Sequence, residues 1–289
     1  MSDTAARAHR SATSVATLRF ISSFDDPVVN PDRLAGAFLG RPLRTAVRVP
    51  PLRRAICGGV RRRFPGALEY QAARTRHLDR ILHERLADGI EQVAILGVGY
   101  DTRSWRFHDR LRGARVFEVD QPGTLARRQS RAGALGPVAA ARVAVDFERD
   151  DLPTRLDAVG FDPGRPVLFL WEGVTMFIDE AAVGRTLGFV GRAASGSSLV
   201  FDYVARSALT RPADYYGGAE AARHFARTGE PWRFGVDPED VDSLLAPHGL
   251  RPRSHFGPED LRRNYLADAG PPSDGRVPGF HGIVHAVVS

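Results

Sequence analysis

The sequence predicts an α/β fold built on a doubly wound, mostly parallel β-sheet. From about residue 90 onward, short and almost wholly apolar runs alternate with segments of helical composition. Strands that are apolar on both faces are typical of a parallel sheet covered by helices on both sides. Most runs end directly at an acidic residue or a glycine, which places polar groups at the edge where α/β folds bind ligands. The expected strands are 93–96, 115–119, 142–145, 167–171, 198–201 and, last, 281–288.

The first 65 residues predict short helices and no strand. Proline follows Asp26, Asn30 and Arg41, and each X-Pro step disfavours helix at the residue before it. We therefore expect a helical cap at 1–65, followed by a ligand-binding core at 66–204. The core opens with a helix, because apolar residues recur at helical spacing from Leu78 to Leu86. Gly89 stands where a left-handed residue would end that helix.

Residues 205–236 show no strand pattern but are rich in aromatic rings. We expect an insertion after the fifth strand that covers the ligand edge as a lid. The alternative is that these rings only pack the insertion onto the sheet. Residues 237–289 complete the sheet, with a helix near 237–248, and the chain 1–289 is expected to be one domain. The candidate lid contacts to an acceptor are Tyr215, Tyr216, His224 and Trp232.

Composition excludes several classes of protein. The 289 residues are 43% hydrophobic and 26% charged, typical of a globular domain and not of disordered or collagen-like chains. No run approaches the roughly 20 apolar residues of a membrane helix, and the N-terminus lacks the apolar core of a signal peptide. The single cysteine, Cys57, excludes an intrachain disulfide and a cysteine-based zinc site. We expect a cytoplasmic protein with no metal and no membrane partner.

The net charge of +6 invites comparison with nucleic-acid-binding proteins. All 40 basic residues are arginine, a bias typical of GC-rich coding sequence that accounts for part of the basicity. A surface for nucleic acid would alternate cations with stacking rings, and only Phe64 adjoins the densest cluster. A solvated or carboxylate-paired face is favoured over an anion-binding one, and nucleic acid is not the expected partner. The cluster comprises Arg41, Arg44, Arg48, Arg53, Arg54, Arg61, Arg62 and Arg63.

The segment after the first strand carries the strongest functional signal. Gly97 and Gly99 allow a sharp turn and close approach of the backbone to a ligand. Asp120 ends the next strand, 23 residues after Gly97. In nucleotide-binding folds an acid at about this spacing accepts hydrogen bonds from both ribose hydroxyls. The alternative is a purely structural turn followed by a solvated acid.

The same segment argues against a dinucleotide. The pattern G-x-G-x-x-G would have a third glycine where this chain has Thr102. Asp101 would also bring negative charge close to a pyrophosphate. An adenosine cofactor without phosphate fits better, and S-adenosylmethionine is the obvious one.

These residues belong to a series of blocks that resembles a known family. The sequence is similar to the leucine carboxyl methyltransferases, S-adenosylmethionine-dependent enzymes that include bacterial small-molecule O-methyltransferases. The resemblance is strong from about 70 to 177 and weaker on both sides. It implies the Rossmann-like fold of class I methyltransferases, with seven strands. The matching blocks begin at Tyr70, Leu96, Phe117, Val145 and Trp171, and 231–235 also resembles bacterial members.

The resemblance implies a role for each matched position. Arg74 should pair with the methionine carboxylate, Gly97 and Gly99 should lie under the methionine, and Asp120 should hold the ribose. Asp146 and Phe147 should contact the adenine, and Glu172 should stand near the methionine amino group or the sulfonium. The alternative for Arg74 is a surface ion pair, and Arg76 is another candidate for its role. Glu172 would otherwise be an acid at a helix N-terminus. The expected cofactor site comprises Arg74, Gly97, Gly99, Asp101, Asp120, Gln121, Asp146, Phe147 and Glu172.

The acceptor is less constrained than the cofactor. Phe177 stands where the family often has tyrosine, and regions 1–65 and 205–236 match only loosely. A carboxylate acceptor needs no base, whereas a phenol, with a pKa of about 10, benefits from one. The candidate bases are His224, Asp202 and His77, but His77 is expected to be a surface or packing residue, so the catalytic residue stays open.

The predicted function is S-adenosylmethionine-dependent O-methylation of a carboxyl or phenolic oxygen on a small molecule. An aromatic, polyketide-like or other secondary metabolite would suit a ring-lined lid that carries arginines such as Arg206, Arg211, Arg223 and Arg227. One alternative is methylation of a protein C-terminal carboxylate. Another is a basic nucleic-acid-binding or anion-binding protein, and a third is a relative that binds the cofactor without catalysis. The oligomeric state stays open.

Overall fold

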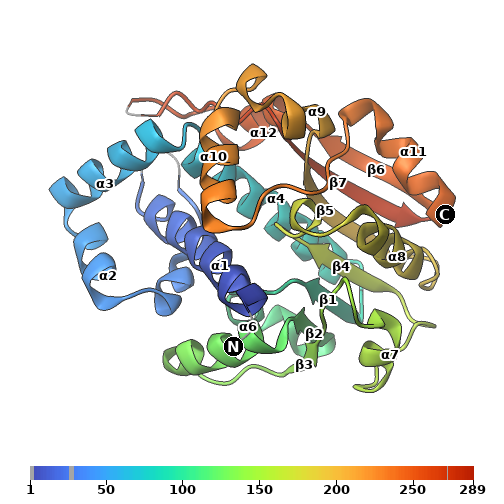
Figure 1. The fold of residues 1–289 in the computed structure, drawn as a ribbon. Coiled ribbons are helices and arrows are strands. Elements are labelled where there is room, and N and C mark those ends of the chain that lie inside the picture. Colours follow the sequence, from blue (N-terminus) through green and yellow to red (C-terminus); the bar gives the residue numbers. More distant parts are fainter. Residues whose placement is uncertain (1–2, 26–28, 272) are drawn as a thin grey trace.

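Seven strands form one sheet in the order β3-β2-β1-β4-β5-β7-β6 (Figure 1). The computed structural model describes residues 3–25, 29–271 and 273–289. Neighbouring strands are parallel except where β7 runs antiparallel to both β5 and β6. This is the doubly wound, mostly parallel, seven-stranded sheet that the sequence predicts. The strands are β1 Gln92–Leu96, β2 Arg115–Asp120, β3 Ala140–Ala144, β4 Val167–Trp171, β5 Ser198–Val204, β6 Leu250–Phe256 and β7 His281–Val288.

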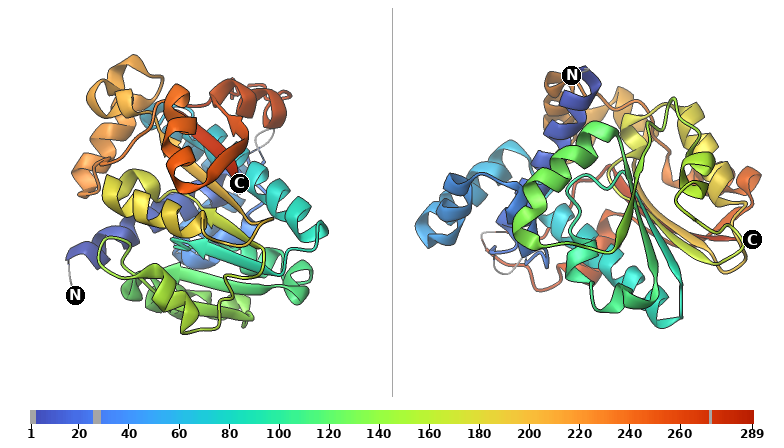
Figure 2. Two further views of the ribbon diagram at one scale, coloured as in Figure 1. Left: turned by 90° about the vertical axis from the view of Figure 1, so that its right-hand side faces the viewer. Right: turned by 90° about the horizontal axis from the view of Figure 1, so that it is seen from below.

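Side chains alternate between two hydrophobic layers along the central strands. Ala94 and Leu96 of β1 face one layer, whereas Val93 and Ile95 face the other. The first layer includes α7 (Leu152–Asp157), α8 (Glu180–Val190) and α11 (Val241–Leu245). The second includes α4 (Ala67–Ala87), α6 (Pro122–Arg131) and α12 (Pro258–Tyr265). Figure 2 shows helices on both sides of the sheet, which explains why its central strands are apolar throughout.

The described residues of 1–65 form helices and no strand, as expected, and the first of these helices is long. The cap consists of α1 (Asp3–Ser22), η1 (Arg33–Phe38), α2 (Arg41–Arg48) and α3 (Pro50–Arg63). It has a hydrophobic cluster of its own, in which Phe20 and Phe38 are buried. Tyr100 joins that cluster from the loop after β1 and stacks on Phe38, with ring centroids 4.5 Å apart. The cap is thereby fixed to the turn that follows the first strand.

The insertion at 205–236 is helical and lies between β5 and β6 along the chain. It contains α9 (Arg206–Thr210), η5 (Pro212–Asp214) and α10 (Gly218–Thr228). Gly217 and Gly229 flank α10 with positive φ angles of 75° and 80°. A Cβ on Gly217 would lie 2.6 Å from the carbonyl oxygen of Pro65, so the insertion packs closely against the end of the cap.

Short elements connect the rest of the core. Gly89, with φ +83°, follows α4 as expected. Asp237 directly precedes η6 (Pro238–Asp240) in the N-cap position, but its side chain makes no capping hydrogen bond. Its carboxylate accepts instead from the N–H and hydroxyl of Ser207. No helix among the described residues is long and apolar enough to cross a bilayer. The remaining elements are α5 (Arg103–Arg106), η2 (Arg110–Gly113), η3 (Ala132–Leu135), η4 (Thr175–Phe177), η6 (Pro238–Asp240) and η7 (Ala246–His248).

Candidate active site

A cavity of about 760 Å³ lies at the carboxyl edge of the parallel strands. Its wall includes the turn after β1, the ends of β2 and β4, residues 12–19 of α1 and parts of the insertion. The wall is polar near the strand ends and rich in rings near the insertion. The rings belong to Phe64, Phe147, Phe177, Phe225, Trp232 and Phe280, with Tyr70, His224 and His281 beside them. The cap and the insertion thus enclose the ligand edge that the sequence predicts.

The turn after β1 is a glycine turn that brings backbone to the cavity. Gly97 and Gly99 both line the cavity and have φ angles of +70° and +47°. A Cβ on Gly97 would lie 2.2 Å from Cγ2 of Val174, so only glycine fits there. The N–H of Gly99 donates to Oδ2 of Asp120 at 2.7 Å. The turn and the acid that the sequence associates are therefore hydrogen-bonded to each other.

Asp120 is a buried carboxylate in the cavity wall, with only 9% of its surface exposed. Its two oxygens accept from the N–H groups of Gly99 and Gln121, each at 2.7 Å. Among the described residues it belongs to no ion pair. Burial raises the pKa of Asp120, although these N–H donors oppose the shift. A buried acid without a cation favours further hydrogen-bond donors, and the two hydroxyls of a ribose would supply them.

The other side of this polar region comes from the segment after β3. Asp146, Phe147 and Gln121 all line the cavity there. The carboxylate of Asp146 accepts from the N–H of Glu148 at 3.1 Å, and the Phe147 ring lies 6.2 Å from that of Trp171. A ring and a carboxylate on one wall can contact the face and the exocyclic amine of an adenine. This arrangement fits the predicted adenine contacts, which stay a prediction.

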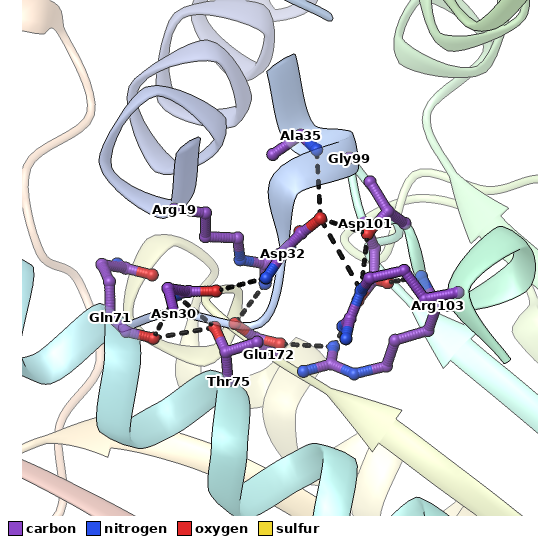
Figure 3. Close-up of polar contacts among 12 residues, drawn as sticks. Arg19, Asn30, Asp32, Ala35, Gln71, Thr75, Gly99, Asp101, Arg103 and Glu172 are labelled. Atoms are coloured by element: carbon purple, nitrogen blue, oxygen red, sulfur yellow. Dashed lines mark hydrogen bonds and ion pairs between the residues drawn. The ribbon is translucent and has the colours of Figure 1, made fainter. Parts of the chain in front are cut away.

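Glu172, which directly follows β4, lies at the centre of a buried ionic network (Figure 3). Its carboxylate pairs with Arg19 of α1, with Arg74 Nε at 2.9 Å and with Arg103 Nη1 at 2.7 Å. Burial alone would raise the pKa of Glu172, but the three guanidinium groups hold it well below its usual range. Glu172 is therefore ionised and fixed by three elements that are distant in sequence. Glu172 is therefore more than an acid at a helix N-terminus, because three arginines pair with it.

The network continues away from the cavity through Arg103. That guanidinium pairs with Asp101 and, through Nε, with Asp79 at 2.8 Å. Burial alone would raise the pKa of Asp101, but Arg103 lowers it. Asp32 connects the network to the cap, since its carboxylate lies 3.7 Å from Arg19 and accepts from the Thr102 hydroxyl at 2.6 Å. Asp101, a predicted cofactor residue, thus lines the cavity but is already paired.

Arg74 reaches the cavity from α4, as predicted, but with its guanidinium engaged. It pairs with Glu172 and Asp202, and its Nη2 donates to Gln71 at 2.9 Å. The alternative, Arg76, donates to the carbonyl of Tyr265 at 2.7 Å and does not line the cavity. Arg76 is therefore excluded as the cation of the site. Contact of Arg74 with the methionine carboxylate stays a prediction.

The structure separates the candidate bases. Asp202 is fully buried and does not line the cavity, and it accepts from Tyr70, Arg74 and the N–H of Gly173. This placement argues for a positioning role and against proton transfer from an acceptor. His77 is also buried away from the cavity, where Nδ1 lies 2.7 Å from the Tyr265 hydroxyl, as expected for a packing residue.

Two histidines with described side chains line the cavity, and the sequence argument identified only one. His224 lies on α10, and its ring meets Phe64 edge-on at 4.8 Å. Burial, with Arg227 and Arg63 nearby, lowers the pKa of His224. His281 starts β7 and stacks on Tyr70, with ring centroids 3.8 Å apart. Because β7 is antiparallel to β5, its first residue lies at the carboxyl edge; strand direction is the signal that would have identified His281.

Of the four residues predicted to contact the acceptor from the lid, two line the cavity and two do not. Trp232 and His224 line the cavity, whereas Tyr215 and Tyr216 do not. The Tyr215 hydroxyl lies 2.5 Å from that of Ser207, and the Arg276 guanidinium covers the Tyr216 ring at 4.0 Å. Both tyrosines are therefore packing residues, because their rings are used within the insertion and against the C-terminal segment. The arginines expected to line the lid, Arg206, Arg211, Arg223 and Arg227, also lie outside the cavity wall.

The match to known proteins agrees with this site. The family model of leucine carboxyl methyltransferases matches residues 12–191. A Frankia alni protein is 31% identical over 277 residues, covering 93% of this chain and 83% of its own length. A Streptomyces avermitilis protein is 34% identical over 220 residues, 74% and 73% of the two chains. A Mycolicibacterium smegmatis relative is 37% identical over 181 residues, but the match covers only 55% of its length. All three bear a provisional name, S-adenosyl-L-methionine-dependent methyltransferase.

Solved structures support the fold. A DUF574 family protein from Streptomyces avermitilis has a TM-score of 0.59 at 17% identity, covering 83% of this chain and 91% of that one. A provisionally named methyltransferase from Thermobifida fusca has a TM-score of 0.57 at 19% identity, covering 92% and 97%. The fold is thus the α/β fold of class I methyltransferases. With the family match across residues 12–191 and the two long alignments, the chain belongs to the leucine carboxyl methyltransferase family.

Proposed function

We propose that the protein is an S-adenosylmethionine-dependent O-methyltransferase of small molecules, acting on a phenolic or carboxyl oxygen. The observation that carries the proposal is Asp120, a buried carboxylate without an ion pair among the described residues. It lies in a cavity wall that continues from the Gly97–Gly99 turn to a ring-rich region. The family relatives carry the name of this cofactor, which supports the same interpretation.

The residues of the cavity fit the cofactor. Asp120 would accept from the ribose hydroxyls, while Asp146 and Phe147 would contact the adenine. Glu172 is held ionised by its three arginines and would attract the amino group or the sulfonium. When bound, the cofactor supplies an electrophilic methyl group on sulfur. The protein then has to hold an acceptor oxygen in line with that group, and such orientation is worth on the order of 7–11 kcal/mol.

The ring-rich region would hold the acceptor. Phe177, Phe225 and Trp232 form an apolar wall that excludes water and suits a flat, aromatic molecule of the secondary-metabolite type. Arg233, the arginine of this region, is already paired with Glu148 and lies 3.7 Å from Asp179. Arg63 and Arg227 lie near His224 but outside the cavity wall. Among the described residues, the wall therefore offers a carboxylate acceptor no unpaired arginine, which favours a phenolic oxygen over a carboxyl. The cap and the insertion both line the cavity, which favours a small molecule over a protein terminus.

A calorimetric titration with S-adenosylhomocysteine tests the proposal. We expect micromolar binding to the intact chain and a loss of about 10-fold to 100-fold in Asp120→Ala, because hydrogen bonds to a charged group contribute about 1.5–3 kcal/mol. Asp109→Ala, at a carboxylate that is 84% exposed, is the matched control and should bind normally. Absence of binding to the intact chain would contradict the cofactor assignment. Equal binding by the Asp120 variant would contradict the site.

A second measurement tests the reaction. The intact chain is incubated with the cofactor and a panel of phenols, naphthols and aromatic acids, and the products are analysed by mass spectrometry. We expect the gain of one methyl group on phenolic members of the panel. Binding of the cofactor with no methylated product across the panel and across protein C-terminal peptides would favour a non-catalytic binding protein.

A further inference from the structure

The net positive charge of the chain comes from one segment. Residues 41–63 contain eight arginines and no acidic residue. The rest of the chain contains the other 32 of the 40 basic residues and all 34 acidic residues, so its net charge is −2. A compositional bias toward arginine would spread the excess along the chain. The concentration of charge in 41–63 therefore calls for a structural explanation.

This segment forms α2 and α3, a helical arm that projects from the body (Figure 1). Its arginines are largely unpaired. Arg61 pairs with Asp25 and Glu69, and it is the only member of the cluster with an ion pair among the described residues. Arg53 donates to the carbonyl of Val47. Arg41, Arg48, Arg54, Arg62 and Arg63 are exposed, and Arg44 is half-buried.

The turn between the two helices is apolar and exposed. Val49 and Leu52 have 41% and 50% of their surface exposed, and they are the two exposed large hydrophobic residues among those described. Pro50 and Pro51 between them are exposed as well. Apolar side chains at the end of a cationic helical arm are typical of segments that insert shallowly into the interface of a membrane.

We propose that this arm, residues 41–63, binds the surface of an anionic phospholipid bilayer, with Val49 and Leu52 inserted between headgroups and the arginines on lipid phosphates. The expectation of no membrane partner depended on the lack of a spanning segment, and an interfacial contact needs none. Nucleic acid is disfavoured, because Phe64, the ring beside the cluster, packs against His224 and the turn presents apolar groups to any phosphate backbone.

The C-terminal end of the arm leads directly into the wall of the cavity. Val60 and Phe64, at the end of α3, line the cavity, whereas Val49 and Leu52 lie at the opposite end of the same helix. Binding through the arm would thus hold the cavity close to the bilayer, where apolar aromatic acceptors partition. The surface contact itself does not depend on the proposed methyltransferase activity.

Co-sedimentation with phospholipid vesicles tests the proposal. The full chain is mixed with phosphatidylcholine vesicles with and without phosphatidylglycerol, at low and at physiological salt. We expect binding only to the anionic vesicles, weaker at high salt. Arg41→Gln/Arg48→Gln/Arg54→Gln should lower the affinity about 100-fold, since each basic residue near an anionic surface contributes roughly one factor of five. Leu52→Glu should weaken binding while leaving all eight arginines of the arm unchanged.

Matched controls make the test specific. Arg112→Gln/Arg263→Gln removes two arginines that are 71% and 72% exposed elsewhere, and should leave vesicle binding unchanged. Failure of the intact chain to bind anionic vesicles would overturn the proposal, as would equal binding by the triple variant. Binding to duplex DNA with the same dependence on Arg41, Arg48 and Arg54, but not to vesicles, would replace the bilayer with nucleic acid. Dimerisation abolished by Leu52→Glu, without vesicle binding, would assign the arm to self-association.

Discussion

Arg19 and Glu172 lie 153 residues apart in the sequence and form an ion pair in which the two side chains are only 5% and 6% exposed. One residue belongs to the helix that covers the cavity and the other to the strand end beneath it. Because Arg74 and Arg103 hold the same carboxylate, the cap is tied to the cofactor region by one shared anion. The attachment of the cap therefore depends on the same buried carboxylate that contributes to the polar wall of the cavity.

Arg19→Met should lower the free energy of unfolding by about 2 kcal/mol, because a charged hydrogen bond to a buried acid is removed while two arginines still neutralise that acid. Urea unfolding followed by circular dichroism measures the change. Arg112→Met, at an exposed ion pair, is the control and should be close to neutral. A loss no larger than the control would show that the cap is held by its apolar contacts alone.

His224→Gln should lower kcat on a phenolic acceptor by about 100-fold, while His281→Gln should change kcat only a few-fold. Both histidines line the cavity, but a base is most effective when its pKa lies near the working pH. Burial and the nearby Arg74 lower the pKa of His281 to about 3, which makes it a weak base. Initial rates across pH, with carboxylic acids as comparison acceptors, measure the effect.

Carboxylate acceptors need no base, so neither histidine variant should change their kcat by a large factor. Unchanged affinity for S-adenosylhomocysteine in both variants would show that the cofactor site is intact. A large loss in His281→Gln, with His224→Gln unaffected, would reverse the assignment.

Trp232→Ala should raise KM for aromatic acceptors about 10-fold or more, because its ring lines the cavity beside Phe225 and Phe280. Tyr216→Ala removes a ring of the same insertion that lies outside the cavity wall, and should leave KM unchanged. Steady-state kinetics on one naphthol and one aliphatic acceptor separates stacking from general damage to the insertion. Equal effects of the two variants would contradict the division of the insertion into contact and packing residues.

Acidification should destabilise the protein between about pH 6.5 and pH 4. Burial, then Arg80 and His285, lower the pKa of the buried His77 to about 3, so the unfolded chain binds a proton that the folded state rejects. Stability from this group is complete above pH 6.5 and is lost as the pH falls toward the folded-state pKa. From pH 7 to about pH 5 the loss is about 2 kcal/mol for one such histidine.

His77→Gln should therefore lose about 2 kcal/mol less than the parent protein over that range. Urea unfolding at the two pH values gives both numbers. His83→Gln, at an exposed histidine of the same helix, should keep the pH dependence of the parent. A variant at position 77 that loses as much stability on acidification as the parent would place the sensitivity elsewhere.

The sequence predicts the sheet well, except at one edge. The strands β1, β2, β4 and β5 are mostly apolar and almost wholly buried, so their residues alone identify them. The sequence does not identify the edge strand β6, because it holds Pro252 at a register shift and has arginines on its exposed side. The long α1 was expected as shorter pieces, since its weak amphipathic pattern gives little signal without the surface that it covers.

The sequence predicts the parts of the site that a local motif defines. It does not predict the contacts between elements that are distant in the sequence. The Gly97–Asp120 spacing correctly associates the glycine turn with the acid, which the structure joins by a hydrogen bond from the N–H of Gly99. The Arg19–Glu172 and Arg74–Asp202 pairs join distant elements, and no local pattern indicates them. The expectation that Tyr215 and Tyr216 contact the acceptor is wrong, because composition identifies rings but not the direction in which they point.

The position of β7 between β5 and β6 imposes an order of assembly. The strands β3, β2, β1, β4 and β5 pair only with one another and with β7, so most of the sheet can form before the last strand is synthesised. β6 is made before β7 but pairs with no other strand, so it can join the sheet only together with β7 or after it. His281, the first residue of β7, reaches the cavity only in that final step. A nascent chain can therefore hold the Gly99–Asp120 hydrogen bond while its acceptor region is still open.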